Sequence, residues 1–173
     1  VFVRNTKWQK SIISQEERAE KKKQKSSLVL ITGEEDVGKK PLAKALEKKL
    51  FNDGKIIYFL GIGNLLYGVD ADIKLNDKNH KEEHIRRLAE VSNIMLDSGA
   101  ILIVTAIGLS ENDVKLIRTT LNNDRILTVW LGEEVTTDID FDLHLRDALD
   151  HNHATNKIKG LLQEKNIIFN PFK

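Results

Sequence analysis

One short segment of this chain has the strand, glycine-rich turn and helix order of a phosphate-binding loop. Residues 27–32 form an apolar run of the kind found in buried strands, and apolar residues recur at helical spacing over residues 42–50. Between them, the pattern G-x-x-x-x-G-K runs from Gly33 to Lys39. In such a loop, backbone N–H groups at the start of the helix surround the phosphates, and the lysine reaches the terminal ones. The segment therefore predicts an α/β domain with a ligand site at the carboxyl edge of its sheet.

The chemistry of this loop departs from the usual pattern. Phosphate-binding loops carry Ser or Thr after the lysine to hold Mg²⁺, whereas the Lys40 ammonium has no lone pair for a metal. Glu34, Glu35 and Asp36 add three carboxylates, and each one within ~4 Å of a phosphate oxygen costs about 1 kcal/mol in water and about 4 kcal/mol near a protein surface. Two hypotheses remain open: a loop that binds an anion or nucleotide, and a turn that binds nothing. The candidate binding residues are Gly33, Gly38, Lys39 and Lys40.

Strands and helices are expected to alternate along the rest of the chain. Short apolar runs predict the strands, and apolar positions at helical spacing predict the helices. This alternation predicts a central parallel sheet with helices on both faces, which is a three-layer sandwich. The further strands are expected at 55–60, 101–105 and 126–131, and the further helices at 80–98, 111–121 and 156–165.

The length and composition are those of one folded unit with an extension. A chain of 173 residues with 40% hydrophobic content can bury one sizeable core, which we expect over residues 27–173. Residues 1–26 are expected to form a polar helical extension. Within it, 14–25 is acidic early and basic late, as the helix dipole favours. This segment predicts a solvated helix, with a nucleic-acid patch as the alternative. Because the chain begins at valine, we expect it to be part of a longer protein.

Charge and hydropathy exclude several classes of partner. The net charge is +1 and the pI about 8.0, so no overall field recruits nucleic acid or an acidic membrane. No apolar run has membrane-spanning length, and the first residues do not resemble a signal peptide. With no cysteine, disulfides and thiolate metal sites are excluded. We expect a cytoplasmic protein that binds neither nucleic acid nor membrane.

An alternating acidic stretch near the carboxyl end is a candidate metal site. Over residues 138–145, apolar side chains alternate with three aspartates and a histidine, which predicts a strand. Residues two apart on a strand lie about 7 Å from each other, too far for most neighbours to share one ion. We therefore expect a solvent-facing edge strand and no metal site. His151 and His153 lack a third ligand nearby and are expected to lie in a loop. The acidic face comprises Asp138, Asp140, Asp142 and His144.

Four segments together resemble the adenylylsulfate kinase family. They are Trp8 with 14–19, the A-x-A-L-E-x-x-L pattern at 43–50, the segment E-H-I-R-R-L-A-E-V at 83–91, and 142–145 with the final helix. Members of this family phosphorylate adenosine 5′-phosphosulfate on its ribose 3′-hydroxyl using MgATP. The resemblance covers nearly the whole chain and implies a P-loop NTPase-type fold. It also implies ATP and Mg²⁺ as cofactors, a homodimer, and fusion to or association with a sulfate adenylyltransferase.

The chain departs from the family pattern at positions that bind metal or substrate. Where the family has D-G-D-N-x-R, residues 61–66 read G-I-G-N-L-L, so both carboxylates and the arginine are absent. Asn64 remains and is, by resemblance, a candidate substrate-binding residue. By resemblance, Lys81 and His84 stand where an arginine and an asparagine bind the substrate. Ser110 is the counterpart of the serine in the family's F-I-S-P-x-R stretch and the candidate catalytic residue. Only residues 132–137 are expected to join the last two strands, too few for the basic lid that the family carries there.

These observations leave three hypotheses about function. The first is an inactive or impaired adenylylsulfate kinase-like domain with a structural or regulatory role in sulfate assimilation. The second is an active kinase that uses other metal ligands, such as Asp70 or Asp72. The third is a module that binds an anion or nucleotide at the loop without turnover. The resemblance implies ATP and Mg²⁺ as cofactors, whereas the residues of the loop do not favour their binding. Whether the chain is an enzyme stays open.

Overall fold

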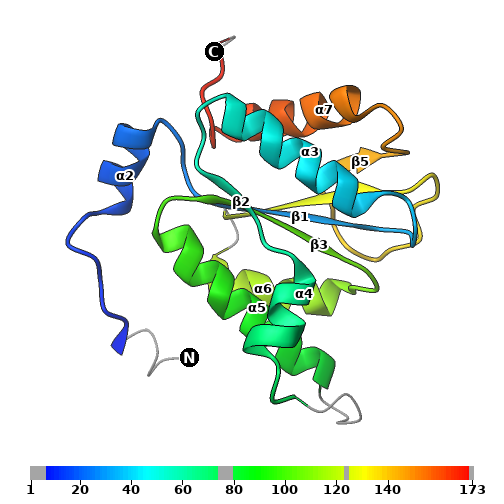
Figure 1. The fold of residues 1–173 in the computed structure, drawn as a ribbon, viewed down its shortest axis with the longest axis horizontal. Coiled ribbons are helices and arrows are strands. Elements are labelled where there is room, and N and C mark those ends of the chain that lie inside the picture. Colours follow the sequence, from blue (N-terminus) through cyan, green and yellow to red (C-terminus); the bar gives the residue numbers. More distant parts are fainter. Residues whose placement is uncertain (1–6, 74–79, 123–124, 172–173) are drawn as a thin grey trace.

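The sheet of this protein is parallel throughout and has the loop residues at the end of its central strand. The computed structural model describes residues 7–73, 80–122 and 125–171 (Figure 1). Within these ranges the sheet has five strands in the order β2-β3-β1-β4-β5, and every neighbouring pair is parallel. The strands are β1 (Ser27–Gly33), β2 (Ile57–Phe59), β3 (Ile101–Ala106), β4 (Ile126–Leu131) and β5 (Leu143–Leu145).

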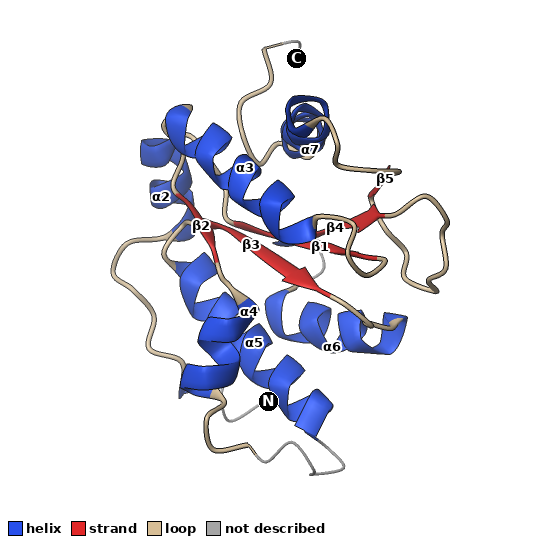
Figure 2. Ribbon diagram, turned by 45° about the vertical axis from the view of Figure 1, so that its right-hand side comes forward, coloured by secondary structure: helices blue, strands red, loops and turns tan. Residues whose placement is uncertain are grey.

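Helices cover both faces of this sheet, as Figures 1 and 2 show. One face carries α3 (Lys39–Asn52) and α7 (His151–Glu164), and the other carries α5 (His80–Asp97) and α6 (Glu111–Leu121). Beside α5, the short α4 (Ile62–Asn64) continues into a π-helical turn, η1 (Leu65–Val69). The expected three-layer sandwich of P-loop NTPase type is thus confirmed.

The burial of β1 explains its place in the centre of the sheet. All seven of its residues are buried, so both of its faces must be covered. Val29 and Ile31 pack in the core under α3 and α7, while Leu28 and Leu30 pack in the core with α5 and α6. Because β1 pairs with β3 and with β4, its carboxyl end brings the glycine loop beside the residues that follow both strands.

The amino-terminal extension forms a polar helix, α2 (Gln15–Lys22), with no buried residue. Ser14 caps it by accepting a hydrogen bond from the backbone N–H of Glu17 at 3.1 Å. The Gln15 amide donates to the Asp97 carbonyl at 2.9 Å, and the buried Gln24 side chain donates to the Ile56 carbonyl at 2.8 Å. These bonds hold the segment against the amino edge of the sheet. No described helix is long and apolar enough to span a membrane.

The structure corrects three expectations in the last third of the chain. The predicted strand over 138–145 is paired only at Leu143–Leu145, and the connection from β4 to β5 spans residues 132–142 rather than 132–137. Before β5, the Asp138 and Asp142 carboxylates accept hydrogen bonds from the backbone N–H groups of Glu111 and Thr128. The last helix begins at His151, so His151 and His153 lie in its first turn and not in a loop. Asp150 caps this helix by accepting from the backbone N–H of His153 at 3.1 Å.

Candidate functional site

The glycine loop connects β1 to α3 at the carboxyl edge of the sheet. At Gly33 a Cβ would overlap the carbonyl oxygen of Leu131, so only glycine allows β1 and β4 to approach here. Gly38 precedes α3 with φ of 88°, a left-handed conformation that glycine adopts without strain. The sequence pattern thus forms the strand-to-helix turn that a phosphate-binding loop requires.

Lys39 is turned back onto its own loop. The residue is only 8% exposed, and its ammonium donates a hydrogen bond to the Glu34 carbonyl. Burial lowers the pKa of Lys39, against the opposing effect of the Asp36, Glu35 and Glu34 carboxylates. The lysine that would reach terminal phosphates therefore satisfies the loop backbone in this structure.

Carboxylates surround the place where phosphates would lie. Glu35 and Asp36 line a hollow of about 440 Å³ over the loop, together with Lys39 and Lys40. Glu34 is tied to the segment after β4, because its carboxylate accepts from the backbone N–H of Glu134 at 3.2 Å. An anion in this hollow would face both carboxylates and lysines.

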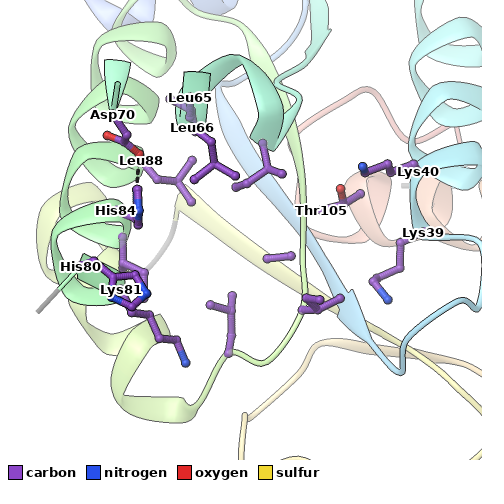
Figure 3. Close-up of a pocket in the computed structure, with 15 residues that line it drawn as sticks. Lys39, Lys40, Leu65, Leu66, Asp70, His80, Lys81, His84, Leu88 and Thr105 are labelled. Carbon is purple, nitrogen blue, oxygen red and sulfur yellow. Dashed lines mark hydrogen bonds and ion pairs between the residues drawn. The ribbon is translucent and has the colours of Figure 1, made fainter. Parts of the chain in front are cut away.

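A larger cavity of about 520 Å³ opens beside the loop (Figure 3). Lys40 and Thr105 lie on one side of it, and Asp70 and His84 lie on the other. Most of the wall is aliphatic. The apolar lining residues are Ile62, Leu65, Leu66, Ile85, Leu88, Ala106, Ile107 and Leu109, and His80, Lys81 and Lys39 complete the lining.

The polar side of this cavity is built around Asp70. Its N–H donates to the Leu65 carbonyl at 2.7 Å, which closes the π-helical turn η1 and fixes the aspartate above α5. Asp70 is 3% exposed, and its Oδ2 lies 2.6 Å from His84 Nδ1 (Figure 3). Its Oδ1 lies 3.7 Å from Arg87 Nη1. His84 Nε2 is buried and has no hydrogen-bond partner among the described residues.

Arg87 of α5 binds the residues at and just after the end of η1. Its guanidinium donates to the Asp72 carboxylate, with 3.1 Å between Nη2 and Oδ2, and to the Val69 carbonyl at 3.0 Å. It also contacts Glu83 at 2.9 Å, where Arg86 binds as well. These two arginines lower the pKa of Glu83 to about 2. Asp72 and Glu83 are therefore engaged in ion pairs on the outer side of α5.

The sequence-predicted site residues fall into two groups. Lys39, Lys40, Lys81 and His84 come together around the cavity. Lys81 is partly engaged, since its ammonium donates to the Gly108 carbonyl at 2.7 Å and lies 3.2 Å from Asp113.

Ser110 and Asn64 do not line the cavity. Ser110 caps α6, because its hydroxyl accepts from the Asp113 N–H at 3.3 Å while Asp113 accepts from the Ser110 N–H at 2.9 Å. Asn64 ends the short α4 and is exposed. The aliphatic wall formed by Leu65 and Leu66 was not predicted, because no sequence pattern distinguishes such residues from ordinary core residues.

Two aspartates before β5 accept hydrogen bonds from backbone N–H groups. Asp142 Oδ2 accepts from the Thr128 N–H at 2.8 Å, and Asp138 Oδ1 accepts from the Glu111 N–H at 3.0 Å. His144 Nε2–H donates to the Gly132 carbonyl at 2.7 Å. Across the described ranges, no three His, Asp or Glu side chains are grouped to hold a metal ion.

The Mg²⁺ ion that the loop motif implies does not fit the residues present. Position 40 offers an ammonium instead of a hydroxyl, and positions 61 and 63 are glycines. Asp70, the one carboxylate lining the cavity among the described residues, is already held by His84 and Arg87.

Comparisons with known proteins agree with this fold. The adenylylsulphate kinase family model matches residues 25–150. The adenylyl-sulfate kinase of Clostridium acetobutylicum is 36% identical over 120 residues, which are 69% of this chain and 60% of that protein. That of Staphylococcus epidermidis is 31% identical over 123 residues, 71% of this chain and 61% of that protein. The chain thus spans less than two thirds of the length of these relatives.

Solved structures show the same architecture. The APS kinase of Mycobacterium tuberculosis in complex with AMPPNP and APS superposes with a TM-score of 0.67 at 24% identity, covering 81% of this chain and 99% of that one. A hexameric APS kinase from Thiobacillus denitrificans superposes with a TM-score of 0.71 at 18% identity, covering 85% of this chain and 30% of that one. At these identities the structures establish a shared fold. With the family model matching most of its length, this chain belongs to the adenylylsulphate kinase family.

Proposed function

We propose that this chain is an adenylylsulfate kinase-like domain that has lost magnesium-dependent phosphoryl transfer and keeps a ligand cavity. The observation that carries the proposal is that Asp70 is buried and already paired. It is the one carboxylate at the cavity among the described residues, and it is buried against His84 and Arg87. A metal ion at Asp70 would have to displace a cation that already pairs with it.

The requirements of phosphoryl transfer support this proposal. The reaction depends on positioning and on neutralising charge with Mg²⁺, lysine and arginine. Here Lys40 replaces the metal-binding hydroxyl, and Leu66 stands where the resemblance places an arginine. Lys39 bonds to the Glu34 carbonyl. The metal-binding hydroxyl and the arginine are thus absent, and the loop lysine Lys39 is engaged elsewhere.

The alternative, an active kinase with other metal ligands, depends on Asp70 or Asp72. Asp72 is 69% exposed, and both of its oxygens accept from Arg87. Its use by Mg²⁺ would break a bidentate ion pair, which is among the stronger hydrogen-bonded arrangements of charged groups. We therefore favour the inactive domain.

The biological setting follows from the family. Relatives bear the name adenylyl-sulfate kinase, so we place this domain in sulfate assimilation with a structural or regulatory role in the cytoplasm. We propose that it acts with a fused or associated sulfate adenylyltransferase and self-associates, in line with the hexameric APS kinase of similar fold. Residues 1–26 would be its extension and 27–173 its kinase-like domain.

A coupled assay with MgATP and adenylylsulfate tests the loss of transfer. We expect no turnover above that of a sample without protein, next to an active family member as positive control. Turnover comparable to the positive control that is abolished by Lys39→Ala would overturn the proposal, because the loop would then be serving catalysis.

A restored variant makes the test sharper. Lys40→Ser with Gly61→Asp and Gly63→Asp returns the metal-binding hydroxyl and the two carboxylates of the family pattern. We expect measurable transfer to appear in this triple variant. The matched control is Lys44→Ser, which changes an exposed lysine one turn further along α3 and leaves the loop untouched.

A further inference from the structure

The cavity beside the loop has the chemistry of a site for an organic molecule rather than for a phosphate chain. Leu65 and Leu66 face it from η1, Leu88 from α5, and Ile107 from the segment after β3. Aliphatic walls bind the apolar body of a ligand by removing its surface from water. At about 520 Å³, the cavity is within the size range of small-molecule sites.

One end of the cavity carries an available positive charge. The Lys40 side chain is exposed, lines the cavity, and has no hydrogen bond or ion pair with any residue that the structure describes. Lys39, its neighbour, is already bonded to the Glu34 carbonyl. At this end of the cavity, Lys40 is therefore the cation that an anionic ligand group would meet.

The loop limits how much negative charge such a ligand can carry. Glu35 and Asp36 line the adjoining hollow with Lys40. A negative charge about 4 Å from either carboxylate is repelled, and the repulsion is stronger near a protein surface than in water. A single anionic group can pair with Lys40 from the cavity side, whereas a chain of phosphates would extend over the carboxylates.

The opposite wall offers a second polar contact. His84 Nδ1 lies 2.6 Å from Asp70 Oδ2, so Nε2 is the ring nitrogen left to contact a ligand. This atom is buried without a hydrogen-bond partner among the described residues, which is unfavourable. A ligand hydroxyl or N–H that reaches His84 would remove this cost.

We propose that the cavity binds, without a metal ion, an amphipathic organic monoanion. Its aromatic or aliphatic body lies against Leu65 and Leu66, its sulfonate, sulfate or carboxylate pairs with Lys40, and a hydroxyl or N–H contacts His84. The proposal rests on the proposed function in one respect: the site is no longer required to hold MgATP.

Fluorescence titration with anilinonaphthalene sulfonate tests the proposal, because this probe has an aromatic body, one sulfonate and one N–H. We expect saturable binding to one site per chain, unchanged by EDTA or Mg²⁺. Lys40→Met should raise Kd about tenfold, the effect of one lost charge-assisted contact. Lys44→Met, on the same helix outside the cavity, should leave Kd unchanged.

A second variant and a second probe are included so that the result does not depend on whether one variant folds. Leu66→Glu places a carboxylate on the half-buried apolar wall and should also raise Kd. The neutral probe N-phenylnaphthylamine should bind wild type and Lys40→Met equally. Absence of binding, or equal Kd values in wild type, Lys40→Met and Leu66→Glu, would overturn the proposal. Transfer activity in the coupled assay would overturn only the loss of transfer, so the two proposals fail separately.

Discussion

His84 Nδ1 lies 2.6 Å from Asp70 Oδ2, and this contact joins α5 to the end of the π-helical turn η1. The side chain of Asp70 is buried, and the Nη1 of Arg87 lies 3.7 Å from its other oxygen, Oδ1. The pair therefore positions the polar side of the cavity and also ties together two segments that flank residues 74–79. A buried pair of this kind has consequences for both stability and binding.

Loss of the Asp70 carboxylate should destabilise the fold. In Asp70→Asn, the His84 ring loses its charged acceptor, and we expect the free energy of unfolding to fall by about 2 kcal/mol. Urea unfolding followed by circular dichroism measures this change. Asp72→Asn is the matched control, because Asp72 pairs with Arg87 at the surface and its loss should destabilise the fold less than the loss of Asp70. Equal losses in the two variants would contradict a buried role for Asp70.

Ser110 should act on stability through its helix cap. Ser110→Ala removes the acceptor of the Asp113 N–H, and we expect a loss of about 1 kcal/mol in the free energy of unfolding. Ser110→Thr keeps a hydroxyl at the cap and should recover most of this loss. Thermal unfolding of the three proteins provides the measurement. A Ser110→Ala variant as stable as wild type would show that the capping box contributes nothing.

Gly33 should be intolerant of any side chain. In Gly33→Ala, the new Cβ would overlap the Leu131 carbonyl, which separates β1 from β4 at the loop. We expect a loss of about 3 kcal/mol or more, in the range of overpacking with backbone strain. Gly63→Ala is the control, since a Cβ there meets no atom within 4 Å and alanine favours the helix. Chemical denaturation of both variants distinguishes this close approach from a general cost of replacing glycine.

The ion pairs of Glu83 should make stability depend on acidic pH. Hydrogen bonds from Arg86 and Arg87 lower the pKa of Glu83 from 4.5 to about 2 in the folded chain. Because the folded pKa is below the unfolded one, this stabilisation is present above pH 4.5 and is lost as the pH falls toward 2. We expect the unfolding midpoint of wild type to fall more across this window than that of Glu83→Gln. Glu82→Gln, an exposed neighbour on α5, should follow wild type; identical profiles for Glu83→Gln and wild type would refute the assignment.

Much of the fold could be predicted from local pattern. The apolar runs at 101–105 and 126–131 and the helix at 111–121 agree with β3, β4 and α6 to within one residue. Continuous apolar runs indicate strands buried on both faces, and the glycine pattern indicates the turn between β1 and α3. The strand predicted at 138–145 was too long. Two of its aspartates, Asp142 and Asp138, instead accept hydrogen bonds from the backbone N–H groups of Thr128 and Glu111. A period of two in the sequence cannot distinguish a paired strand from a segment held by its side chains.

The sequence by itself determined the sandwich of strands and helices, the loop from Gly33 to Lys40 and the absence of its metal-binding hydroxyl, since all of these depend on residue type and local spacing. Only the tertiary structure decided that Asp70 would be buried against His84 and that Lys40 would face Leu66 across a cavity. The pair joins η1 to α5, and the cavity lies between α3, η1 and α5. The place of these elements depends on the order of the strands in the sheet, which is set by packing between segments that are distant in the chain. The carboxyl edge of the sheet is where the loop, the aliphatic wall and the buried pair meet.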